Sequence, residues 1–534
     1  MHLLRRVQGR LVREWNLIRN GLQVRRVKRY FLAQGVISRE HPVVFFNAST
    51  RLSGLSQNAG FSLIASFVVR AAGIPVSYFV CERGLSKCVL GTDREKPHAP
   101  PPCAECTRTS SIIFNPMENV TRFQFQPDIT LQRAIDRLSL SELVAFSYHD
   151  LPLGEIVLPS LRWILRKHHL SNNEGTRHIA RGYIQSAWSL YNAFKNYALE
   201  KQPRAVVVFN GMFFPEAVVS HVCRELDIPD YSHEVGMLPL SAFFTDQEAT
   251  AYPVRVDQDF QLSDQQNQRL DDYLNNRMQG KFVTAGVKFW PEMVALGDSF
   301  WKRASQFQSI IPIFTNVVFD TSQGHANVLF DHMFAWLDVV KDAIQSHPES
   351  LFVIRAHPDE MRKGKESRET VAEWFQINRL EELRNVIFIS PRQHVSSYQL
   401  IQKAKFIMVY NSTIGLEASI MGKPVLCAGK ARYTMIPTVN FPNTVEAYQA
   451  SLDEFLNAET IHHPHEFIQN ARGVLYSQLF RASLPFDQYL VEDGVWRGYV
   501  RLRPFDPRSL TIEKTPQMGV VLNGIRDGSP FIRE

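Results

Sequence analysis

Two short segments in the second half of the chain carry side chains suited to holding a phosphate group. The first, RAHPDE, places Arg355, His357 and Pro358 after an apolar run, and Pro358 prevents the strand from continuing. A histidine there can donate a hydrogen bond to a phosphate oxygen and stabilise charge on a departing nucleotide phosphate. The alternative is that His357 only caps a turn. We predict that these three residues belong to a nucleotide site and that His357 assists catalysis.

The second segment, VYNSTIGLEASIMGKPVL (409–426), is typical of a strand, a turn and a short helix. Asn411 makes the turn, Ser412 is a favoured N-cap, and a helix over 413–421 stops at the following glycine. Free backbone N–H groups, the positive end of the helix dipole and the hydroxyls of Ser412 and Thr413 would together form a phosphate site. We predict that Asn411, Ser412 and Thr413 bind the nucleotide.

A carboxylate on the same short helix needs a polar partner. Glu417 lies among apolar residues such as Leu416 and Ala418. Because an ionised glutamate offers two acceptor oxygens to two neighbouring hydroxyls, a ribose diol is a natural partner. The alternative is that Glu417 lies on a solvated face and has no role. We predict that Glu417 binds the ribose of the nucleotide.

The elements that must position these residues alternate between strand and helix. Apolar runs that indicate strands occur at 42–49, 75–80, 205–211, 230–236, 310–316, 351–357, 385–390, 406–410 and 424–429. Strands alternating with helices imply parallel sheets covered on both faces, and ligands bind such sheets at the carboxyl ends of the strands. We therefore predict an α/β fold of two Rossmann-like domains that face each other across a cleft.

The length of 534 residues is too great for one core and suggests two large domains with extensions. The expected parts are a basic amphipathic segment (1–40), an acceptor domain (41–300) with a Cys-rich insertion (81–110), a nucleotide-sugar donor domain (301–450) and a C-terminal helix and tail (451–534).

The net charge of +6 is unevenly placed, because residues 1–30 hold nine Lys or Arg against one acid. Leu3, Leu4, Val7, Leu11, Trp15, Ile18 and Leu22 recur in that segment at helical spacing. Such a helix could lie on an anionic membrane surface or pack its apolar stripe on the protein itself. Nucleic acid is a weaker option, because no aromatic-interleaved basic motif follows. No apolar run of membrane-spanning length or secretory signal is seen, so we expect a cytoplasmic protein, peripheral at most at the inner membrane face.

Four cysteines form a separate group with the spacing C-x6-C-x14-C-x2-C. They are Cys81, Cys88, Cys103 and Cys106. Four thiolates around one ion predict a structural zinc, and an iron–sulfur cluster is the second option, because the first spacing is not that of a standard zinc knuckle. Four reduced thiols in a surface loop are the remaining alternative.

The combination of RAHPDE, NSTIGLEASIMGKPVL and the aromatic ARY at 431–433 resembles the C-terminal domain of bacterial capsule polysaccharide biosynthesis proteins. That group is similar to Kdo (3-deoxy-manno-octulosonate) transferases and, more distantly, to bacterial sialyltransferases of the GT-B fold. The resemblance implies a GT-B arrangement in which His357 with Pro358 and Ser412 with Thr413 hold the phosphate of a CMP-sugar. It also implies that Glu417 binds the ribose.

The catalytic acidic pair of the sialyltransferase-like relatives has no clear counterpart here. VEDGVW (491–496) contains the letters but lies past the donor domain, so we treat it as chance. The best candidate base is Glu234 in HEVG, which would take the proton of an acceptor hydroxyl, and His233 is second. The polar loop NASTRLSGLSQNAG (47–60) adds Ser56 and Asn58 as candidate acceptor-binding residues, together with His233.

The sequence thus favours a glycosyltransferase that moves a sugar from a nucleotide-sugar donor, CMP-Kdo or a similar CMP-sugar first, to a capsule or other surface glycan or glycolipid. No cofactor or divalent metal is needed for transfer, because no Asp-x-Asp lies near the donor site. The alternatives are an enzyme similar to UDP-sugar 2-epimerases on the same fold and a non-catalytic scaffold in polysaccharide assembly.

Overall fold

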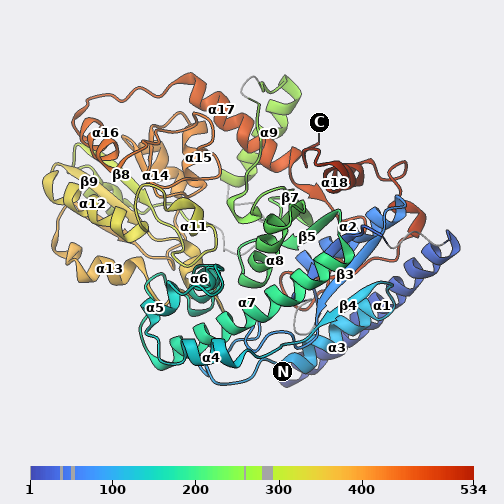
Figure 1. Cartoon of the computed structure of the whole chain (residues 1–534). Helices are drawn as coiled ribbons and strands as arrows, with labels where there is room; N and C mark the ends of the chain where they lie inside the picture. Colours follow the sequence, from blue (N-terminus) through green and yellow to red (C-terminus); the bar gives the residue numbers. More distant parts are fainter. Residues whose placement is uncertain (1, 36–39, 50–53, 258–259, 279–292, 534) are drawn as a thin grey trace.

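The computed structural model describes residues 2–35, 40–49, 54–257, 260–278 and 293–533. Figure 1 shows two α/β units side by side, the first built around β1, β3 and β5 and the second around β8 and β9. The predicted α/β fold with two parallel sheets is confirmed. No helix in the described residues is long and apolar enough to cross a membrane.

The first unit contains a seven-stranded sheet in the order β13-β7-β6-β5-β1-β3-β4. The strands β4, β3, β1, β5 and β6 run parallel, whereas β7 and β13 are antiparallel additions at one edge. The strand bounds are β1 Val43–Asn47, β3 Val76–Cys81, β4 Val120–Phe123, β5 Ala205–Phe209, β6 Asp230–Val235, β7 Ser241–Thr245 and β13 Leu484–Pro485.

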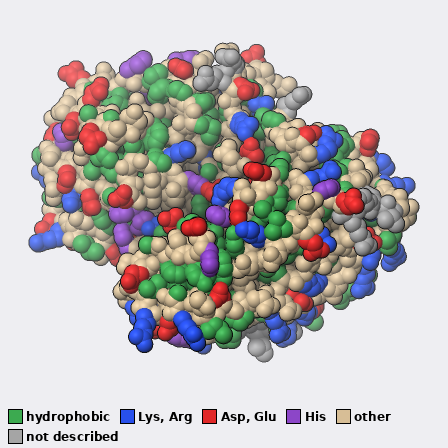
Figure 2. Space-filling view, viewed as in Figure 1, with side chains coloured by type: hydrophobic (Ala, Val, Ile, Leu, Met, Phe, Trp, Pro, Cys, Tyr) green, Lys and Arg blue, Asp and Glu red, His purple; other side chains and the backbone are tan. Residues whose placement is uncertain are grey.

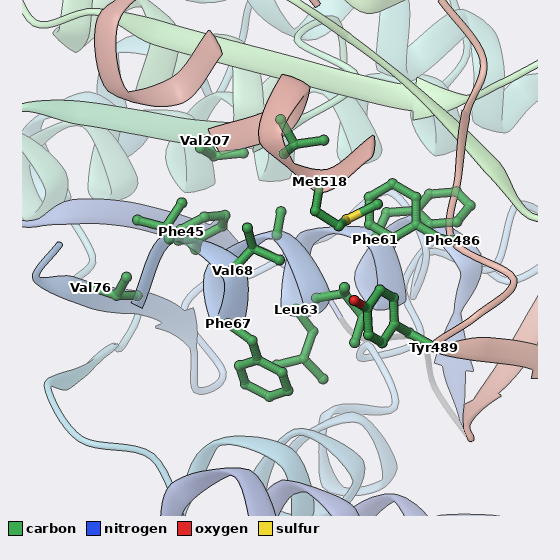
Figure 3. Close-up of a cluster of buried hydrophobic side chains, with 14 of the residues drawn as sticks. Phe45, Phe61, Leu63, Phe67, Val68, Val76, Val207, Phe486, Tyr489 and Met518 are labelled. Atoms are coloured by element: carbon green, nitrogen blue, oxygen red, sulfur yellow. The ribbon is translucent and has the colours of Figure 1, made fainter. Parts of the chain in front are cut away.

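Successive residues of a central strand enter different cores, because side chains alternate across a sheet. In β1, Phe45 packs with the helix α2 (Gln57–Ala71), and its neighbour Phe46 packs with α7 (Glu174–Lys201) and α8 (Phe214–Glu225) on the opposite face. Figure 3 shows the first of these cores, in which side chains of β1, α2 and the C-terminal segment point toward one another. Both faces being covered explains why these strands are apolar throughout.

The second unit contains a five-stranded parallel sheet in the order β10-β9-β8-β11-β12. The strand bounds are β8 Ser309–Phe314, β9 Ser350–Arg355, β10 Val386–Ile389, β11 Ile407–Val409 and β12 Val425–Cys427. The helices around this sheet are α11 Gln323–Ala326, α12 Met333–Ser346, α13 Val371–Ile377, α14 Ser397–Lys403, α15 Ile414–Ile420 and α16 Val445–Asn457. The carboxyl ends of β8, β9 and β11 lie at one edge of this sheet. The two segments predicted to bind a nucleotide, RAHPDE and the turn with Asn411, Ser412 and Thr413, follow β9 and β11 at that edge.

The C-terminal segment, predicted only as a helix and tail, returns to the first unit. Helix α17 (His465–Tyr476) precedes β13, which pairs with β7, and α18 (Pro516–Asp527) packs on α2. The red segment in Figure 1 lies against the first unit accordingly. A small antiparallel sheet of β14 (Leu490–Glu492), β15 (Tyr499–Leu502) and β2 (Leu55–Ser56) joins the two ends of the chain. In VEDGVW, the Asp493 carboxylate accepts N–H bonds from Val495 and Trp496 within a turn.

The basic N-terminal segment forms one helix, α1 (His2–Ala33). One face is buried, with Leu17, Val24 and Val27 in the core. Across from it, four apolar residues of the predicted stripe are half or more exposed: Leu11, Trp15, Ile18 and Leu22. The alternative that this stripe packs on the protein is therefore wrong for these four residues, because a different face of the helix fills that role. The side chains of Leu3, Leu4 and Val7 lie outside the described residues.

The remaining helices of the described chain complete the first unit and the connector. They are α3 Cys103–Phe114, α4 Ile129–Ile135, α5 Leu140–Val144, α6 Leu153–Leu165, α9 Asp264–Met278 and α10 Asp298–Ala304.

Candidate functional site

A cavity of about 970 Å³ lies between the two units, at the carboxyl ends of their parallel strands. Its walls include every predicted nucleotide, acceptor and catalytic residue: Ser56, Asn58, His233, Glu234, Arg355, His357, Pro358, Asn411, Ser412, Thr413 and Glu417. Lysine and arginine side chains are also frequent there: Arg277, Arg355, Arg362, Lys365, Lys430, Arg432 and Arg497. Figure 2 shows charged and histidine side chains gathered along the seam between the two lobes. The lining also contains the five carboxyl groups of Glu216, Glu234, Asp320, Asp359 and Glu417, so the seven cations exceed the acidic groups by two.

His357 begins a short 3-10 helix (Pro358–Met361) at the end of β9. Its Nδ1 accepts the backbone N–H of Asp359 at 3.1 Å, so the proton of the neutral ring lies on Nε2. Burial lowers the pKa of His357, and the nearby carboxylates of Asp359 and Asp320 oppose that shift. The residue thus caps a turn, as one alternative proposed, and this same contact leaves its Nε2–H as a hydrogen-bond donor in the wall of the cavity.

Arg355 is the last residue of β9 and is 7% exposed. Its Nη1 donates to the carbonyl of Gln393 at 3.2 Å, and burial lowers the pKa of its guanidinium to about 10. The described contacts include no carboxylate partner for this cation. A buried guanidinium of this kind is stabilised by any anion that binds in the cavity.

The NST turn follows β11 as predicted, but the helix begins one residue later than expected. Thr413 is the N-cap of α15, and its side chain makes no capping hydrogen bond. Ser412 precedes the cap, and its carbonyl accepts the hydroxyl of Tyr433 at 2.7 Å. Gly415 leaves room for that contact, because a Cβ there would lie 2.5 Å from the Tyr433 oxygen. Tyr433 of the ARY segment therefore stabilises the turn that contains Ser412.

Glu417 is buried, at 3% exposed, and both of its oxygens are engaged inside the protein. Oε1 accepts from Arg277 Nε at 2.7 Å, and Oε2 accepts from the Tyr398 hydroxyl at 2.6 Å. The alternative of a solvated face is wrong, because the carboxylate is buried. Arg277 of α9 and Tyr398 of α14 supply the polar partners that a carboxylate on an apolar helix requires. The need for a partner therefore no longer indicates a ribose, and ribose binding by Glu417 stays a prediction.

Glu234 is the fifth residue of β6, within the segment 230–236 that was predicted as a strand. Its Oε1 accepts the Val235 N–H at 2.7 Å and Asn58 Nδ2 at 3.0 Å, and its Oε2 is 3.4 Å from Asn210 Nδ2. Burial raises the pKa of the Glu234 carboxyl, and these three donors oppose the shift. A carboxyl with a raised pKa that is fixed in place by neutral donors is suited to accept a proton from a substrate hydroxyl.

The predicted acceptor residues differ in their surroundings. The structure begins helix α2 at Gln57, so Asn58 lies in its first turn and not in a loop. Ser56 is the N-cap, and its hydroxyl accepts the Ala59 N–H at 3.1 Å. His233 is 1% exposed between Phe209 and Phe244, and burial lowers its pKa to about 3. Neither ring nitrogen of His233 has a hydrogen-bond partner within the described chain, so a neutral, buried imidazole borders the cavity.

Two residues near Glu234 were not predicted from the sequence. Asp320, in the loop after β8, lies close enough for its charge to raise the pKa of both Glu234 and His357. Asn210 has a positive φ of 65° and fixes its own side chain by accepting the N–H groups of Met212 and Phe213. The Asn-Gly pair after β5 was a sequence signal for this turn, whereas nothing in the local sequence marked Asp320.

Three histidines lie together where the two units meet. His168, His169 and His332 bring ring nitrogens within 4.8 Å of one another. Among the described residues, this is the one group of three or more side chains placed closely enough to hold a metal ion. The Nδ1 of His332 accepts the Ala335 N–H at 3.1 Å, so its Nε2 carries the proton and faces His169 Nε2 at 3.3 Å. His169 Nδ1 in turn contacts Glu369. A chain of hydrogen bonds between the units accounts for this group, and its tautomers leave His332 no lone pair for a metal.

Comparison with known proteins agrees with the resemblance seen in the motifs. Residues 304–454 match the family model described as "Capsule polysaccharide biosynthesis protein". The match confirms the resemblance for the second unit. Over 120 residues the chain is 29% identical to Protein FixF of Sinorhizobium fredii (strain NBRC 101917 / NGR234), covering 22% of this chain. The match spans about a quarter, 26%, of FixF.

Solved structures with a similar arrangement include KpsC of Thermosulfurimonas dismutans, a beta Kdo 2,4 transferase. It is 13% identical, with a TM-score of 0.34 over 60% of this chain and 87% of that one. A UDP-GlcNAc 2-epimerase from Neisseria meningitidis, bound to UDP-GlcNAc, is 12% identical, with a TM-score of 0.22 over 81% of this chain and 98% of that one. At these scores the likeness supports no statement about activity.

Proposed function

We propose that this protein is a glycosyltransferase that transfers a sugar from a nucleotide-sugar donor, a CMP-sugar such as CMP-Kdo first, to a capsule or other surface glycan or glycolipid. The observation that carries the proposal is the composition of one cavity. Hydrogen-bond donors suited to a phosphate, from the second unit, and the carboxylate of Glu234, from the first unit, line the same cavity. The match of residues 304–454 to the capsule biosynthesis family supports the same class of activity.

In the proposed reaction, the second unit holds the donor phosphate. The Nε2–H of His357, the guanidinium of Arg355 and the hydroxyls of Ser412 and Thr413 are the hydrogen-bond donors. These groups also stabilise the charge that remains on the nucleotide phosphate when its bond to the sugar breaks. Their positions are set by strand ends that are buried in the sheet, so little reorganisation is needed when charge develops.

Glu234 acts on the acceptor in this scheme. As the acceptor oxygen bonds to the anomeric carbon, the bond between that carbon and the phosphate oxygen breaks, and the hydroxyl proton passes to Glu234. Asn58 and Asn210 orient the carboxylate without neutralising it, because both are uncharged donors. Asp320 raises the pKa of Glu234 further, which brings the base nearer to neutral pH.

The acceptor is proposed to be lipid-linked, because α1 presents an apolar stripe among basic residues. Leu11, Trp15, Ile18 and Leu22 are exposed, and α1 also carries Arg19, Arg25 and Arg26. Basic residues near an anionic surface each add about 1 kcal/mol of attraction, and the apolar side chains enter the interface. We propose that α1 holds the enzyme on an anionic membrane at the cytoplasmic side.

The direct test is to incubate purified protein with CMP-, UDP- and GDP-sugars and a capsule glycolipid acceptor, and to follow both the nucleotide and the sugar. We expect release of CMP with the sugar on the acceptor, and a loss of about 10²- to 10⁴-fold in rate for Glu234→Gln. Glu225→Gln, on the distant end of α8, is the matched control and should retain the wild-type rate. Release of an epimerised free sugar without any acceptor would instead identify a 2-epimerase.

A further inference from the structure

Four cysteines of the first unit lie as neighbours at one edge of its sheet, beside the cavity. Cys81 ends β3, Cys88 follows in the next turn, and Cys103 and Cys106 occupy the first turn and a half of α3. Cys88 also lines the cavity wall. We propose that these four cysteines hold an inorganic metal centre through four thiolates, independently of the glycosyl transfer proposed above.

The first two cysteines share a local motif that places backbone N–H groups on sulfur. Each is followed three residues later by glycine, in Cys-Glu-Arg-Gly and Cys-Val-Leu-Gly. Gly84 donates its N–H to Cys81 Sγ at 3.3 Å. The Gly91 N–H donates to the Cys88 carbonyl at 3.2 Å, and the N–H groups of Gly91 and Leu90 also lower the pKa of the Cys88 thiol against the larger effect of burial. Hydrogen bonds of this kind favour the thiolate over the thiol. The backbone is thus arranged for negative sulfur at both positions.

Both glycines are required by the space around them. Arg83 has a positive φ of 57°, which turns the Gly84 N–H toward sulfur, and a Cβ on Gly84 would lie 2.2 Å from the Phe123 ring. A Cβ on Gly91 would lie 2.8 Å from Cys88 Sγ. A side chain at position 84 would clash with Phe123, and one at position 91 would clash with the Cys88 sulfur and with Pro101, so both turns need glycine.

The second pair of cysteines lies at the positive end of a helix dipole. Cys103 is the first residue of α3, a helix of 12 residues, and Cys106 follows three residues later. Helix N-termini stabilise thiolates. The charge of Arg83 also lowers the pKa of Cys103, against the larger effect of burial. Each pair therefore has a local feature that stabilises a thiolate, N–H groups at the first pair and a helix N-terminus at the second, against the opposing effect of burial.

The four thiols influence one another electrically. Burial raises the pKa of Cys81 well above its ordinary value, and the neighbouring Cys88, Cys106 and Cys103 raise it further. This mutual effect shows that the four sulfurs lie near one another in the fold. A metal cation bound among them would take each sulfur as the thiolate, with its proton released to solvent.

The spacing of the sulfurs favours a cluster over a single ion. A tetrahedral zinc with Zn–S bonds of about 2.3 Å would hold its sulfurs about 3.8 Å apart. Among the described residues, the groups of three or more donors placed closely enough for one ion do not include these sulfurs. Iron–sulfur clusters bind four cysteines through several iron atoms and hold them farther apart. The expected occupant is therefore an iron–sulfur cluster. Zinc is the second metal that four thiolates can bind.

The test is metal and sulfide analysis of the full-length protein, purified without oxygen and also after incubation with ferrous iron and sulfide or with zinc. We expect about one cluster per chain, with equal iron and acid-labile sulfide and a visible absorption band. Cys103→Ser and Cys106→Ser should each retain less than a tenth of the metal. Cys223→Ala, at a buried position within α8, is the matched control and should retain all of it.

Zinc at one ion per chain, lost in the same two variants, would also support the four-thiolate site and would assign zinc to it. Two results would overturn the proposal. One is a folded wild-type protein that takes up neither iron nor zinc after both incubations. The other is metal content that is unchanged in Cys103→Ser and Cys106→Ser, with circular dichroism showing that both variants are folded.

Discussion

The buried ion pair between Glu417 and Arg277 gives a prediction that separates architecture from ligand binding. The side chain of Glu417 is 4% exposed and that of Arg277 is 18% exposed. Glu417→Ala removes a charge-assisted hydrogen bond of 2.7 Å to Arg277 and a second of 2.6 Å to Tyr398. Removing one partner of a buried ion pair costs about 3–5 kcal/mol, because the other charge remains buried. We expect a loss of that size in unfolding free energy.

Two further variants test the origin of that loss. Glu417→Gln keeps an acceptor for one of the two donors and should lose less, about 1–3 kcal/mol. Arg277→Met removes the buried cation, so Glu417→Ala combined with Arg277→Met should be more stable than Glu417→Ala alone. The coupling energy between the two sites should be about 2 kcal/mol or more. Glu459→Ala, at an exposed position after α16, is the control and should change stability by less than about 0.5 kcal/mol.

The assay is denaturant unfolding followed by circular dichroism and tryptophan fluorescence, compared at equal m-values. A loss below about 1 kcal/mol for Glu417→Ala, or strictly additive effects in the double variant, would refute the reasoning. In that case the carboxylate would be available to a ribose, as the sequence alone suggested. A large loss with strong coupling would show that Glu417 stabilises the packing of α9 against α15.

Three other predictions follow from buried groups and from α1. Burial raises the pKa of Glu216 to about 8, so this carboxyl should contribute a loss of about 4 kcal/mol of stability as pH rises from 5 to 9, and Glu216→Gln should reduce the loss seen in unfolding measurements by that amount. Burial lowers the pKa of His233 to about 3, so this imidazole should contribute a loss of about 3 kcal/mol as pH drops from 7.5 to 4.5, and His233→Phe should reduce the loss by that amount. Glu360 and His168 have pKa values that burial shifts in the same directions and keep slopes of their own, so an unchanged slope in either variant would contradict its assignment. Replacing both Trp15 and Ile18 by Ala should weaken sedimentation with anionic vesicles at least tenfold and leave neutral vesicles unaffected, and equal binding would remove α1 from the membrane surface.

The strands β1, β3, β5, β6 and β8 to β12 were predictable because each is mostly apolar along its length, whereas β4 and β7 of the first sheet were not predicted. Runs such as AVVVF and LFVIR mark buried parallel strands, and the residues after them necessarily lie at the carboxyl edge. This is why Arg355, His357 and Ser412 were predicted and do line the cavity. The helix limits were less predictable: α2 begins at Gln57 because Ser56 caps it, which the polar composition of the loop concealed.

What could not be predicted depends on contacts between distant segments. The partner of Glu417 comes from α9, which lies 140 residues away in sequence, so the local pattern suggested a ligand instead. The C-terminal strand β13 completes the first sheet, although nothing in its two residues indicates a pairing with β7. Asp320 affects both Glu234 and His357 from an exposed loop, where an aspartate is ordinary. Such residues are identified by their neighbours in space and not by spacing along the chain.

The most direct test of the central claim is equilibrium binding of CMP, UDP and GDP, measured by titration calorimetry on the wild-type protein and on His357→Ala and Glu234→Gln. The proposal predicts that CMP binds the wild-type protein and Glu234→Gln with similar affinity, and that His357→Ala weakens binding at least tenfold while remaining folded. A folded wild-type protein that binds none of the three nucleotides would contradict the proposal. The cavity would then belong to a non-catalytic member of the capsule assembly machinery.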